Sequence, residues 1–348
     1  MLETKAIKKV AKEFGLENPS IEPLGEGIIH HTFKAESEVQ TVVLQQLNTN
    51  IFTKPEALVD NYLLVYEHLQ SNGRIRIPEP VESLGGEWLV KDEVGSCWRA
   101  TEFIKNAYSP DSAHDAQAAF TTAACFGSFT KSLQGINISE LDVVIADFHD
   151  LSFRYQQFED AIATAELFKA MRATHVIAEL RQRRHLVDFY ETIKNNSNFP
   201  LRLMHHDCKI GNILFDRTTH EVICPIDLDT IMPGKYFSDV GDMIRSMSCT
   251  EGEESSNWEA IDIRKEFSKN LKQLLAASVK TKEWMTKNIY DSRAKDYSNP
   301  FRKMVFENDS EMEKVTGKLS ENSFILQELE NLKKYKLMIQ GIIRKYKL

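Results

Sequence analysis

The residues best suited to chemistry lie in one short polar loop and in a carboxylate segment that follows it. Residues 205–212 read His-His-Asp-Cys-Lys-Ile-Gly-Asn, and Asp227 comes fifteen residues after Asn212. Asp207 can orient an acceptor hydroxyl and accept its proton, while Asn212 and Asp227 offer the hard oxygen ligands that Mg²⁺ prefers. Lys209 can neutralise charge on a transferring group. The spacing therefore predicts phosphoryl transfer, which depends mainly on positioning and charge neutralisation.

The surroundings of the loop decide how much weight this motif carries. A His-x-Asp-x-x-x-x-Asn string is weak by itself, because an aspartate in a loop is most often a turn residue or a helix cap. Here an apolar pair, Leu203-Met204, leads into the motif, and two short apolar runs, 213–215 and 222–224, predict a hairpin after it. That hairpin would return the chain to the loop and bring the expected metal ligands to one place.

Two residues are expected to support the loop without taking part in the reaction. We assign His205 a structural role, in which a buried hydrogen bond of its ring holds the catalytic loop. Asp239, in the run Asp-Val-Gly-Asp, could accept hydrogen bonds from backbone amides of the loop. It could also cap a helix that the apolar spacing predicts over 240–247, and both roles could hold together.

A glycine-rich turn near the start of the chain is the expected nucleotide-covering segment. Gly25-Glu26-Gly27 precedes two predicted strands, 32–35 and 41–44. Glycine allows the backbone to approach phosphates closely because no Cβ intervenes. Since Gly-x-Gly is common in ordinary hairpin turns, its place before a strand pair, more than the motif itself, favours the nucleotide role.

The N-terminal part of the chain has the pattern of a small mixed lobe. A helix is expected over 54–70, with Pro55 at its start, and short strands are expected over 77–103. The order of strands, helix and strands predicts a small β-rich N-lobe over 1–104.

The remainder of the chain is predicted to be mainly helical. Long stretches over 115–134 and 160–195 have helical apolar spacing and few helix-breaking residues. A chain of 348 residues is long enough for two lobes with separate cores. We therefore expect a larger C-lobe over 105–348, which carries the catalytic loop, the metal site and the acceptor pocket, and an α+β fold class.

The composition is that of an ordinary globular protein, with 42% apolar and 27% charged residues. A net charge of −8 argues against nucleic acid as the main partner. No apolar run is long enough to span a membrane, and lysines interrupt the first fifteen residues, where a secretory signal needs an apolar stretch. The five cysteines are scattered without paired metal spacing, which indicates free thiols in a reducing cytoplasm.

Several segments resemble the aminoglycoside phosphotransferase and choline kinase superfamily and, within it, most closely the N-acetylhexosamine 1-kinase group. The similarity extends from about Lys8 to about Phe267, and the block that begins at Asp227 is its most specific part. The resemblance implies a protein-kinase-like, two-lobed fold. The resembling segments are residues 23–33, 44–52, 147–150, 205–212, 227–234 and 239–242.

The resemblance also implies an enzyme that uses ATP and Mg²⁺ to phosphorylate the anomeric hydroxyl of GlcNAc or GalNAc. The base and the two metal ligands keep the roles given above, and Asp229 joins the metal site. Gln45 stands where related kinases often place a lysine or arginine against the α- and β-phosphates, so charge neutralisation would depend more on Mg²⁺ and Lys209. The residues expected to contact ATP are Gly25, Gly27, Thr32, Gln45, Glu102 and Ile104.

Contacts with the acceptor are expected from His30 and Arg245. His30 stands in place of a polar residue expected after the glycine-rich turn, and Ile28 stands where a histidine is familiar in the characterised enzymes. Trp98 and Arg99 could also contact a sugar or a phosphate, although an aromatic residue beside an arginine more often serves packing and surface pairing.

Three functions stay open at this point. The first is a sugar kinase, with a small-molecule partner and no indicated oligomeric state. The second is a kinase for a cationic acceptor such as choline or an aminoglycoside, attracted by an acidic cluster, although charge runs usually face water. The third is a nucleotide-binding pseudokinase, against which the intact catalytic residues argue. The acidic cluster consists of Glu251, Glu253, Glu254 and Glu259.

Overall fold

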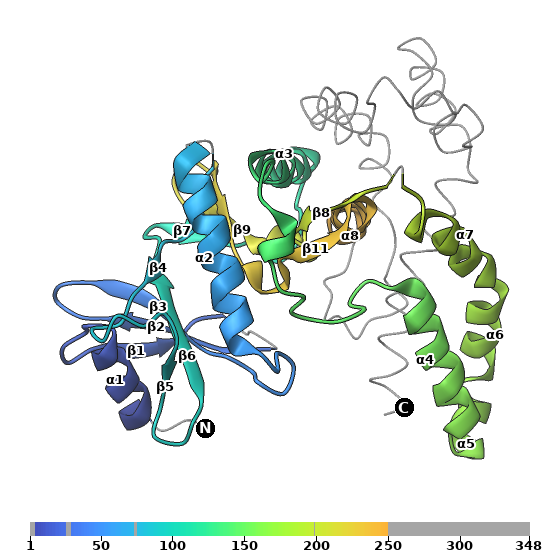
Figure 1. The fold of residues 1–348 in the computed structure, drawn as a ribbon, viewed down its shortest axis with the longest axis horizontal. Helices are drawn as coiled ribbons and strands as arrows, with labels where there is room; N and C mark the ends of the chain where they lie inside the picture. Colours follow the sequence, from blue (N-terminus) through green and yellow to red (C-terminus); the bar gives the residue numbers. More distant parts are fainter. Residues whose placement is uncertain (1–3, 26–28, 73–74, 198, 250–348) are drawn as a thin grey trace, which may run out of the picture.

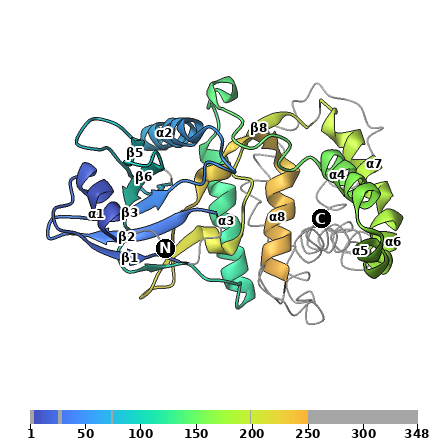
Figure 2. The same cartoon turned by 90° about the horizontal axis from the view of Figure 1, so that it is seen from below.

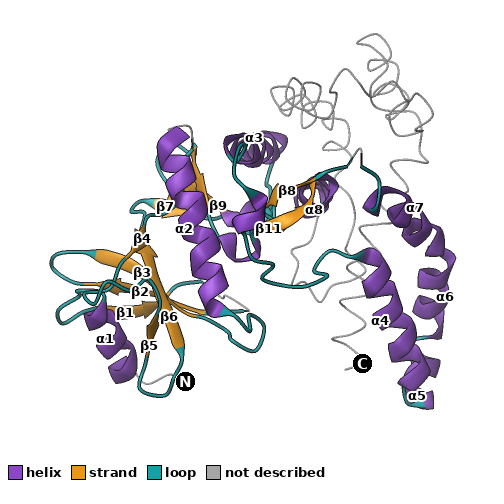
Figure 3. Ribbon diagram, in the orientation of Figure 1, coloured by secondary structure: helices purple, strands orange, loops and turns teal. Residues whose placement is uncertain are grey.

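The computed structural model describes residues 4–25, 29–72, 75–197 and 199–249. Gly27, the acidic cluster between 251 and 259, and the whole stretch from 250 to 348 lie outside the described residues. Within the described ranges, a sheet-rich N-terminal region precedes a mainly helical C-terminal region, as predicted (Figures 1 and 3).

The N-terminal region is an antiparallel sheet, and its strands follow the predicted hairpins. Its order is β1-β2-β3-β6-β4, and β5 also pairs with β6. The strands are β1 (Ser20–Pro23), β2 (His31–Glu36), β3 (Thr41–Gln46), β4 (Pro80–Val81), β5 (Val90–Lys91) and β6 (Cys97–Glu102).

Helix α1 (Thr4–Glu13) covers one face of this sheet (Figure 1). Its apolar side packs on alternate residues of β3 and β6, including Leu44 and Trp98, which are both fully buried. Because successive strand residues point to opposite faces, the neighbours Gln45 and Arg99 face away from α1. Trp98 is therefore a core residue, and its predicted contact with a sugar or phosphate is not available to it.

Helix α2 (Pro55–Asn72) connects the sheet to the rest of the molecule (Figure 1). Proline at its first position needs no hydrogen-bond partner for its nitrogen, which agrees with the predicted start. Its buried residues Tyr62 and Val65 pack against Phe129 of helix α3 (Ala116–Ser132) and against Leu228. Helix α2 thereby packs against the N-terminal sheet and also against the segment that carries the expected metal ligands.

Two small strand groups carry the catalytic loop. Strands β9 (Ile213–Asp216) and β10 (Val222–Pro225) form the predicted hairpin, and β7 (Ala107–Tyr108) pairs with β9. Strand β8 (Leu201–Met204) pairs with β11 (Met232–Lys235), so the chain enters and leaves the site side by side.

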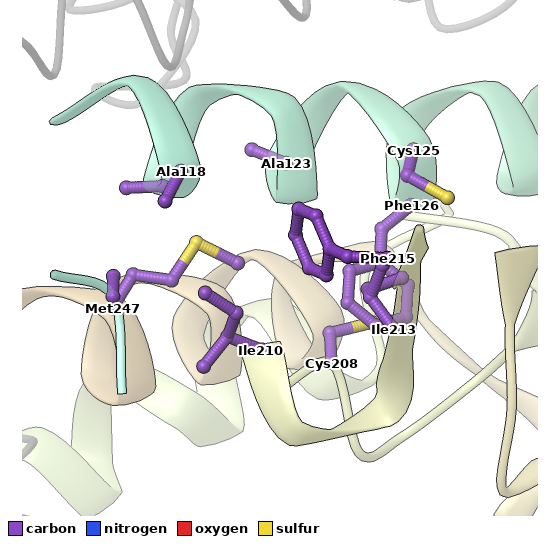
Figure 4. Close-up of a cluster of buried hydrophobic side chains, with 11 residues drawn as sticks. Ala118, Ala123, Cys125, Phe126, Cys208, Ile210, Ile213, Phe215 and Met247 are labelled. Atoms are coloured by element: carbon purple, nitrogen blue, oxygen red, sulfur yellow. The ribbon is translucent and has the colours of Figure 1, made fainter. Parts of the chain in front are cut away.

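The core beneath the loop is formed by helix α3 and helix α8 (Tyr236–Ser248). Figure 4 shows Phe126 of α3 pointing toward Ile213 and Phe215, with Ile210 of the loop and Met247 of α8 beside them. The loop residues are thus attached to a buried apolar cluster on both sides of Asn212.

Four further helices form a separate layer beyond α8 (Figure 2). The predicted helical stretch from 160 to 195 begins earlier than expected, because Asp150 caps the first helix by accepting a hydrogen bond from the Phe153 amide. Among the described residues, no helix combines the length and the apolar character needed to cross a bilayer. The helices are α4 (Leu151–Thr164), α5 (Leu167–Arg172), α6 (Thr174–Gln182) and α7 (Arg184–Lys194).

Candidate active site

One buried carboxylate holds the predicted catalytic loop, residues 205–212, through its backbone. Asp239 is 2% exposed, and its two oxygens accept hydrogen bonds from the backbone amides of His205, at 3.0 Å, and His206, at 2.8 Å. Helix α8 already begins at Tyr236, so Asp239 lies in its first turn and does not occupy the N-cap. A carboxylate in the first turn is favoured by the helix dipole, and this one also satisfies two buried donors of the loop.

The ring of His205 connects the two functional segments. Its Nδ1 accepts from the Asp207 amide at 3.3 Å, and its Nε2 lies 3.1 Å from the carbonyl oxygen of Ile226. A carbonyl can only accept, so the ring proton is on Nε2 and the imidazole is neutral in this arrangement. The hydroxyl of Thr230 donates to the His205 carbonyl at 2.6 Å. His205 thus makes structural contacts through both ring nitrogens and through its backbone carbonyl.

Asp207, Lys209 and Asn212 form a compact group on the loop. The Asn212 side-chain amide donates to the Asp207 backbone carbonyl at 2.9 Å and to Asp207 Oδ2 at 2.8 Å. Lys209 Nζ lies 3.2 Å from Asp207 Oδ2. With its nitrogen turned to Asp207, Asn212 keeps its side-chain oxygen for a different partner. The Asn212 amide and the Lys209 ammonium therefore both contact the Asp207 carboxylate.

Asp227 is brought to this group by the hairpin. The amide of its neighbour Ile226 donates to the Asn212 backbone carbonyl at 2.9 Å. Asp227 has a φ of +59°, a left-handed conformation that a residue with a Cβ adopts only when its surroundings impose it. Its side chain keeps contact with solvent. Partial desolvation among protein atoms, followed by the charges of Asp229 and Asp207, raises the pKa of Asp227.

The donor set suits a divalent cation. Two carboxylates and an amide oxygen are hard ligands of the type that Mg²⁺ takes, usually together with water and substrate phosphates. After desolvation, the charges of Asp229 and Asp207 contribute to the raised pKa of Asp227, and a cation would offset this contribution. Asn212 and Asp227 therefore fit the ion, and the Asp207 carboxylate lies beside Asn212.

Asp229 makes its side-chain contacts with the N-terminal region. It is 3% exposed, its Oδ1 forms an ion pair with Arg99 Nη2, and its Oδ2 lies 2.7 Å from His30 Nε2. Burial favours the neutral acid, but Arg99 and His30 outweigh burial and lower the pKa of Asp229. Both oxygens thus contact donors of the N-terminal region, and the role of Asp229 as a metal ligand stays a prediction.

A row of three side chains crosses the sheet on the face opposite α1. Thr32, Gln45 and Arg99 are direct register partners on β2, β3 and β6. Gln45 Oε1 accepts from Arg99 Nε at 3.0 Å and from Arg99 Nη2 at 2.9 Å, and Gln45 Nε2 donates to Thr32 Oγ1 at 3.3 Å. The Arg99 guanidinium also lies 5.8 Å from the ring centroid of Tyr62 on α2.

His30 completes the connection from the glycine-rich segment. Its Nδ1 accepts from the Asn48 amide at 2.9 Å, so its proton is on Nε2, which faces Asp229. Its ring stacks on Phe52 with centroids 5.3 Å apart. His30 is buried, and these contacts turn its ring toward Asp229.

The other predicted residues lie outside these contacts. Gly25 has a φ of +71°, which glycine adopts without strain. Glu102 pairs with Arg76, and Ile104 is half-buried in the segment that follows β6. Arg245 is buried within α8, where its guanidinium lies 2.8 Å from Asp242, and its contact with the acceptor stays a prediction.

Two structural residues were not found from the sequence. His206 has a φ of +65°, and its ring lies against Gly234, where a Cβ would overlap it. Asn61 on α2 donates to the carbonyls of Asp142 and Ile231 at 2.9 Å each. A single asparagine on the apolar side of a predicted helix is the signal that could have revealed the second of these.

Solved structures with the same fold are phosphotransferases and kinases. The structure of a microcompartment-associated aminopropanol kinase matches with a TM-score of 0.53 and 13% sequence identity, over 94% of this chain and 98% of that one. The spectinomycin phosphotransferase APH(9)-Ia, in complex with ADP and spectinomycin, matches with a TM-score of 0.52 and 14% identity, over the same shares. Aminoglycoside 2'-phosphotransferase-IIIa, in a GDP complex, matches with a TM-score of 0.51 and 12% identity, over 98% and 97%.

These matches confirm the predicted α+β, kinase-like fold. The family comparison goes further, because the model of the phosphotransferase enzyme family APH matches residues 20–260, which is more than half of the sequence. The predicted enzyme class and the predicted superfamily are thereby confirmed. With its catalytic loop and its hairpin-borne aspartate inside the matched range, the chain belongs to the APH phosphotransferase enzyme family.

Proposed function

We propose that the chain is an ATP- and Mg²⁺-dependent kinase that phosphorylates a hydroxyl group of a small molecule. One observation carries this proposal: Asp207, Asn212 and the Ile226–Asp227 segment meet through direct hydrogen bonds, although they are separated by a hairpin. The structural relatives named above were solved with nucleotides in two of the three cases, which supports nucleotide use here.

Asp207 is the proposed base. Its position is set by the Asn212 amide and by the His205 ring, so its carboxylate is oriented before a substrate arrives. In this role it would align the acceptor hydroxyl with the γ-phosphorus and take up the hydroxyl proton. Lys209, beside the same carboxylate, would donate to oxygens of the transferring group and offset their charge.

Asn212 and Asp227 would hold Mg²⁺, which would neutralise negative charge on the phosphates. Gly25, Gly27 and the residues around Thr32 are proposed to cover the nucleotide, and the segment with Glu102 and Ile104 is proposed to contact its base. We assign Asp229 to positioning instead of metal binding, because its oxygens already contact Arg99 and His30.

For the acceptor, we propose the anomeric hydroxyl of an N-acetylhexosamine, GlcNAc or GalNAc. The support is the similarity of the glycine-rich segment and of the block from Asp227 to Gly234 to that group of kinases. A cationic acceptor is the second candidate, because two of the structural relatives act, by their names, on spectinomycin and aminopropanol.

A panel assay tests the proposal. Purified protein is given Mg²⁺-ATP with N-acetylhexosamines, neutral hexoses, amino alcohols and aminoglycosides, and ADP release is measured. Turnover that requires an N-acetylhexosamine and disappears in Asp207→Asn supports the sugar kinase. Turnover with only a cationic acceptor would refute the proposed sugar substrate, while the proposed reaction class, phosphoryl transfer to a hydroxyl, would stand. Nucleotide binding without turnover on any acceptor in the panel would favour the pseudokinase.

A further inference from the structure

Protein kinases hold their nucleotide site together with an ion pair between a lysine on the third strand and a glutamate on the neighbouring helix. In this chain, β3 carries the neutral Gln45 at the corresponding place. The acidic residues of α2 within the described range are Glu56, Asp60 and Glu67, and all three are exposed. Neither half of that ion pair is therefore present between β3 and α2 in the part of the chain that the structure describes.

A different ion pair occupies the region. Arg99, 6% exposed, and Asp229, 3% exposed, pair across the boundary between the sheet and the metal-binding segment. Strand β6, which carries Arg99, lies directly beside β3 in the sheet (Figure 1). Compared with the protein-kinase ion pair, the cation here lies on β6 instead of β3. The acid lies in the segment after Asp227 instead of on the helix.

Each member of the pair is held in place by neutral partners. Two nitrogens of the Arg99 fork donate to Gln45 Oε1, and its guanidinium carbon lies over the ring of Tyr62, 5.8 Å from the centroid. Asp229 is contacted on its other oxygen by His30, which is itself oriented by the Asn48 amide. A buried carboxylate and guanidinium keep their charges only with partners of this kind, and the planar fork of arginine supplies the geometry.

The pair acts on a strained position. Asp229 is two residues beyond Asp227, and it lies in the short 3₁₀ turn η3 (Leu228–Thr230), which Asp227 precedes as the N-cap residue. Asp227 needs surrounding structure to keep its left-handed φ of +59°. Thr230 bonds the other end of the turn to the catalytic loop. The turn is therefore fixed at Asp229 by the sheet and at Thr230 by the loop, with Asp227 at its start.

We propose that Arg99 and Asp229 are positioning residues that hold Asp227 in the orientation needed to bind Mg²⁺, and that Gln45 and His30 orient the pair. This inference rests on the proposed function, since it assigns the four residues to the same metal–nucleotide site. It explains why the lysine position can be neutral: the charge that secures the site lies on the next strand.

The test is calorimetric titration of ADP into the purified protein, with Mg²⁺ and with EDTA. For wild type, Mg²⁺ is expected to strengthen ADP binding. Arg99→Met and Asp229→Asn should each lower that Mg²⁺-dependent gain by about tenfold or more, the size seen when a residue supporting a metal ligand is removed. Affinity for ADP in EDTA should stay within about twofold in the variants. Arg99→Lys keeps the positive charge and loses the planar fork of arginine. Its Mg²⁺-dependent gain in ADP affinity should lie between those of wild type and Arg99→Met.

Folding must be separated from positioning. Removing one partner of a buried ion pair leaves the other charge uncompensated, whereas replacing both with apolar residues is often tolerated. The double variant Arg99→Met/Asp229→Met is therefore expected to fold and still to lack the Mg²⁺-dependent gain. Arg181→Met serves as the matched control, because it removes an arginine fork from Glu159 in the α4–α6 layer.

The possible failures are distinguishable. If wild type does not bind ADP with or without Mg²⁺, the proposed function is wrong. If wild type shows the gain and the folded double variant keeps it, or the variants lose affinity equally in EDTA, the positioning role of Arg99 and Asp229 is refuted while the kinase proposal stands.

Discussion

The catalytic loop and the strand row above it are both fixed by buried polar groups, but the contacts differ in kind. The loop is held through its backbone, by Asp239 and by the neutral ring of His205. The strand row is held through side chains, by an ion pair between Arg99 and Asp229. Backbone contacts fix the path of the chain, whereas the ion pair depends on two charges that lie in different elements. Changes that remove the backbone contacts of the loop should therefore affect stability, and changes in the row should affect metal-dependent binding.

The largest expected effect is on the reaction itself. Asp207→Asn removes the base while keeping the shape of the side chain, and it should lower kcat by about 10³-fold, or about 4 kcal/mol. The thermal midpoint and the affinity for ADP should stay near wild type, because Asp207 is only half-buried. Steady-state ADP release and a thermal melt measure both quantities. A variant with kcat within tenfold of wild type would remove Asp207 from the role of base.

The next effect is expected on the stability of the loop. Asp239→Ala leaves the amides of His205 and His206 without their partner in a buried place, and each unsatisfied donor costs about 1–3 kcal/mol. We expect a loss of about 3 kcal/mol in the free energy of unfolding, measured by urea denaturation. Asp216→Ala, on an exposed turn with two similar backbone contacts, is the control and should cost less. Equal losses at the two sites would contradict the special importance of the buried contacts.

A smaller loss is expected where the loop touches β11. Gly234→Ala places a methyl group against the ring of His206, and overpacking of a buried site costs about 1–3 kcal/mol. His206→Ala in the same chain should recover most of that loss, because it removes the ring that the methyl group meets. If the double variant is no more stable than Gly234→Ala alone, the contact is not the cause.

The smallest effect in this series concerns Lys209. Lys209→Met should lower kcat by about tenfold, since the cation assists a group already neutralised by metal. The ADP affinity should change less than kcat, because the charge matters most in the transition state. Initial rates at saturating ATP and a binding titration measure the two separately. An unchanged kcat would show that Lys209 only pairs with Asp207.

The sequence allowed the loop to be predicted and left the strand row hidden, for a physical reason. Asp207 and Asn212 lie in one short motif, and the hairpin that returns Asp227 is visible as two apolar runs. Arg99 and Asp229 are 130 residues apart, and their meeting depends on the register of β3 and β6 and on the left-handed turn at Asp227. No local pattern encodes that register. For the same reason the sequence does not reveal the contacts of Asp229 with Arg99 and His30.

The start of the α4–α7 layer was also not predictable from a local sequence pattern. The apolar spacing indicated helices up to about residue 195, but the start of α4 depends on Asp150 as a cap, which a local pattern search can overlook. Strand alternation separates Trp98 and Arg99 onto opposite faces, so their roles differ although they are neighbours. The role of each of these residues therefore depends on the face of the sheet to which its side chain points.

The most direct test of the account is Mn²⁺ binding, observed by electron paramagnetic resonance with the protein and ADP. Mn²⁺ takes the same oxygen ligands as Mg²⁺. The account predicts ADP-dependent Mn²⁺ binding to wild type, and its loss in both Asn212→Ala and Asp227→Asn. Binding that is unchanged in these two variants would contradict the metal site on which the proposed reaction depends.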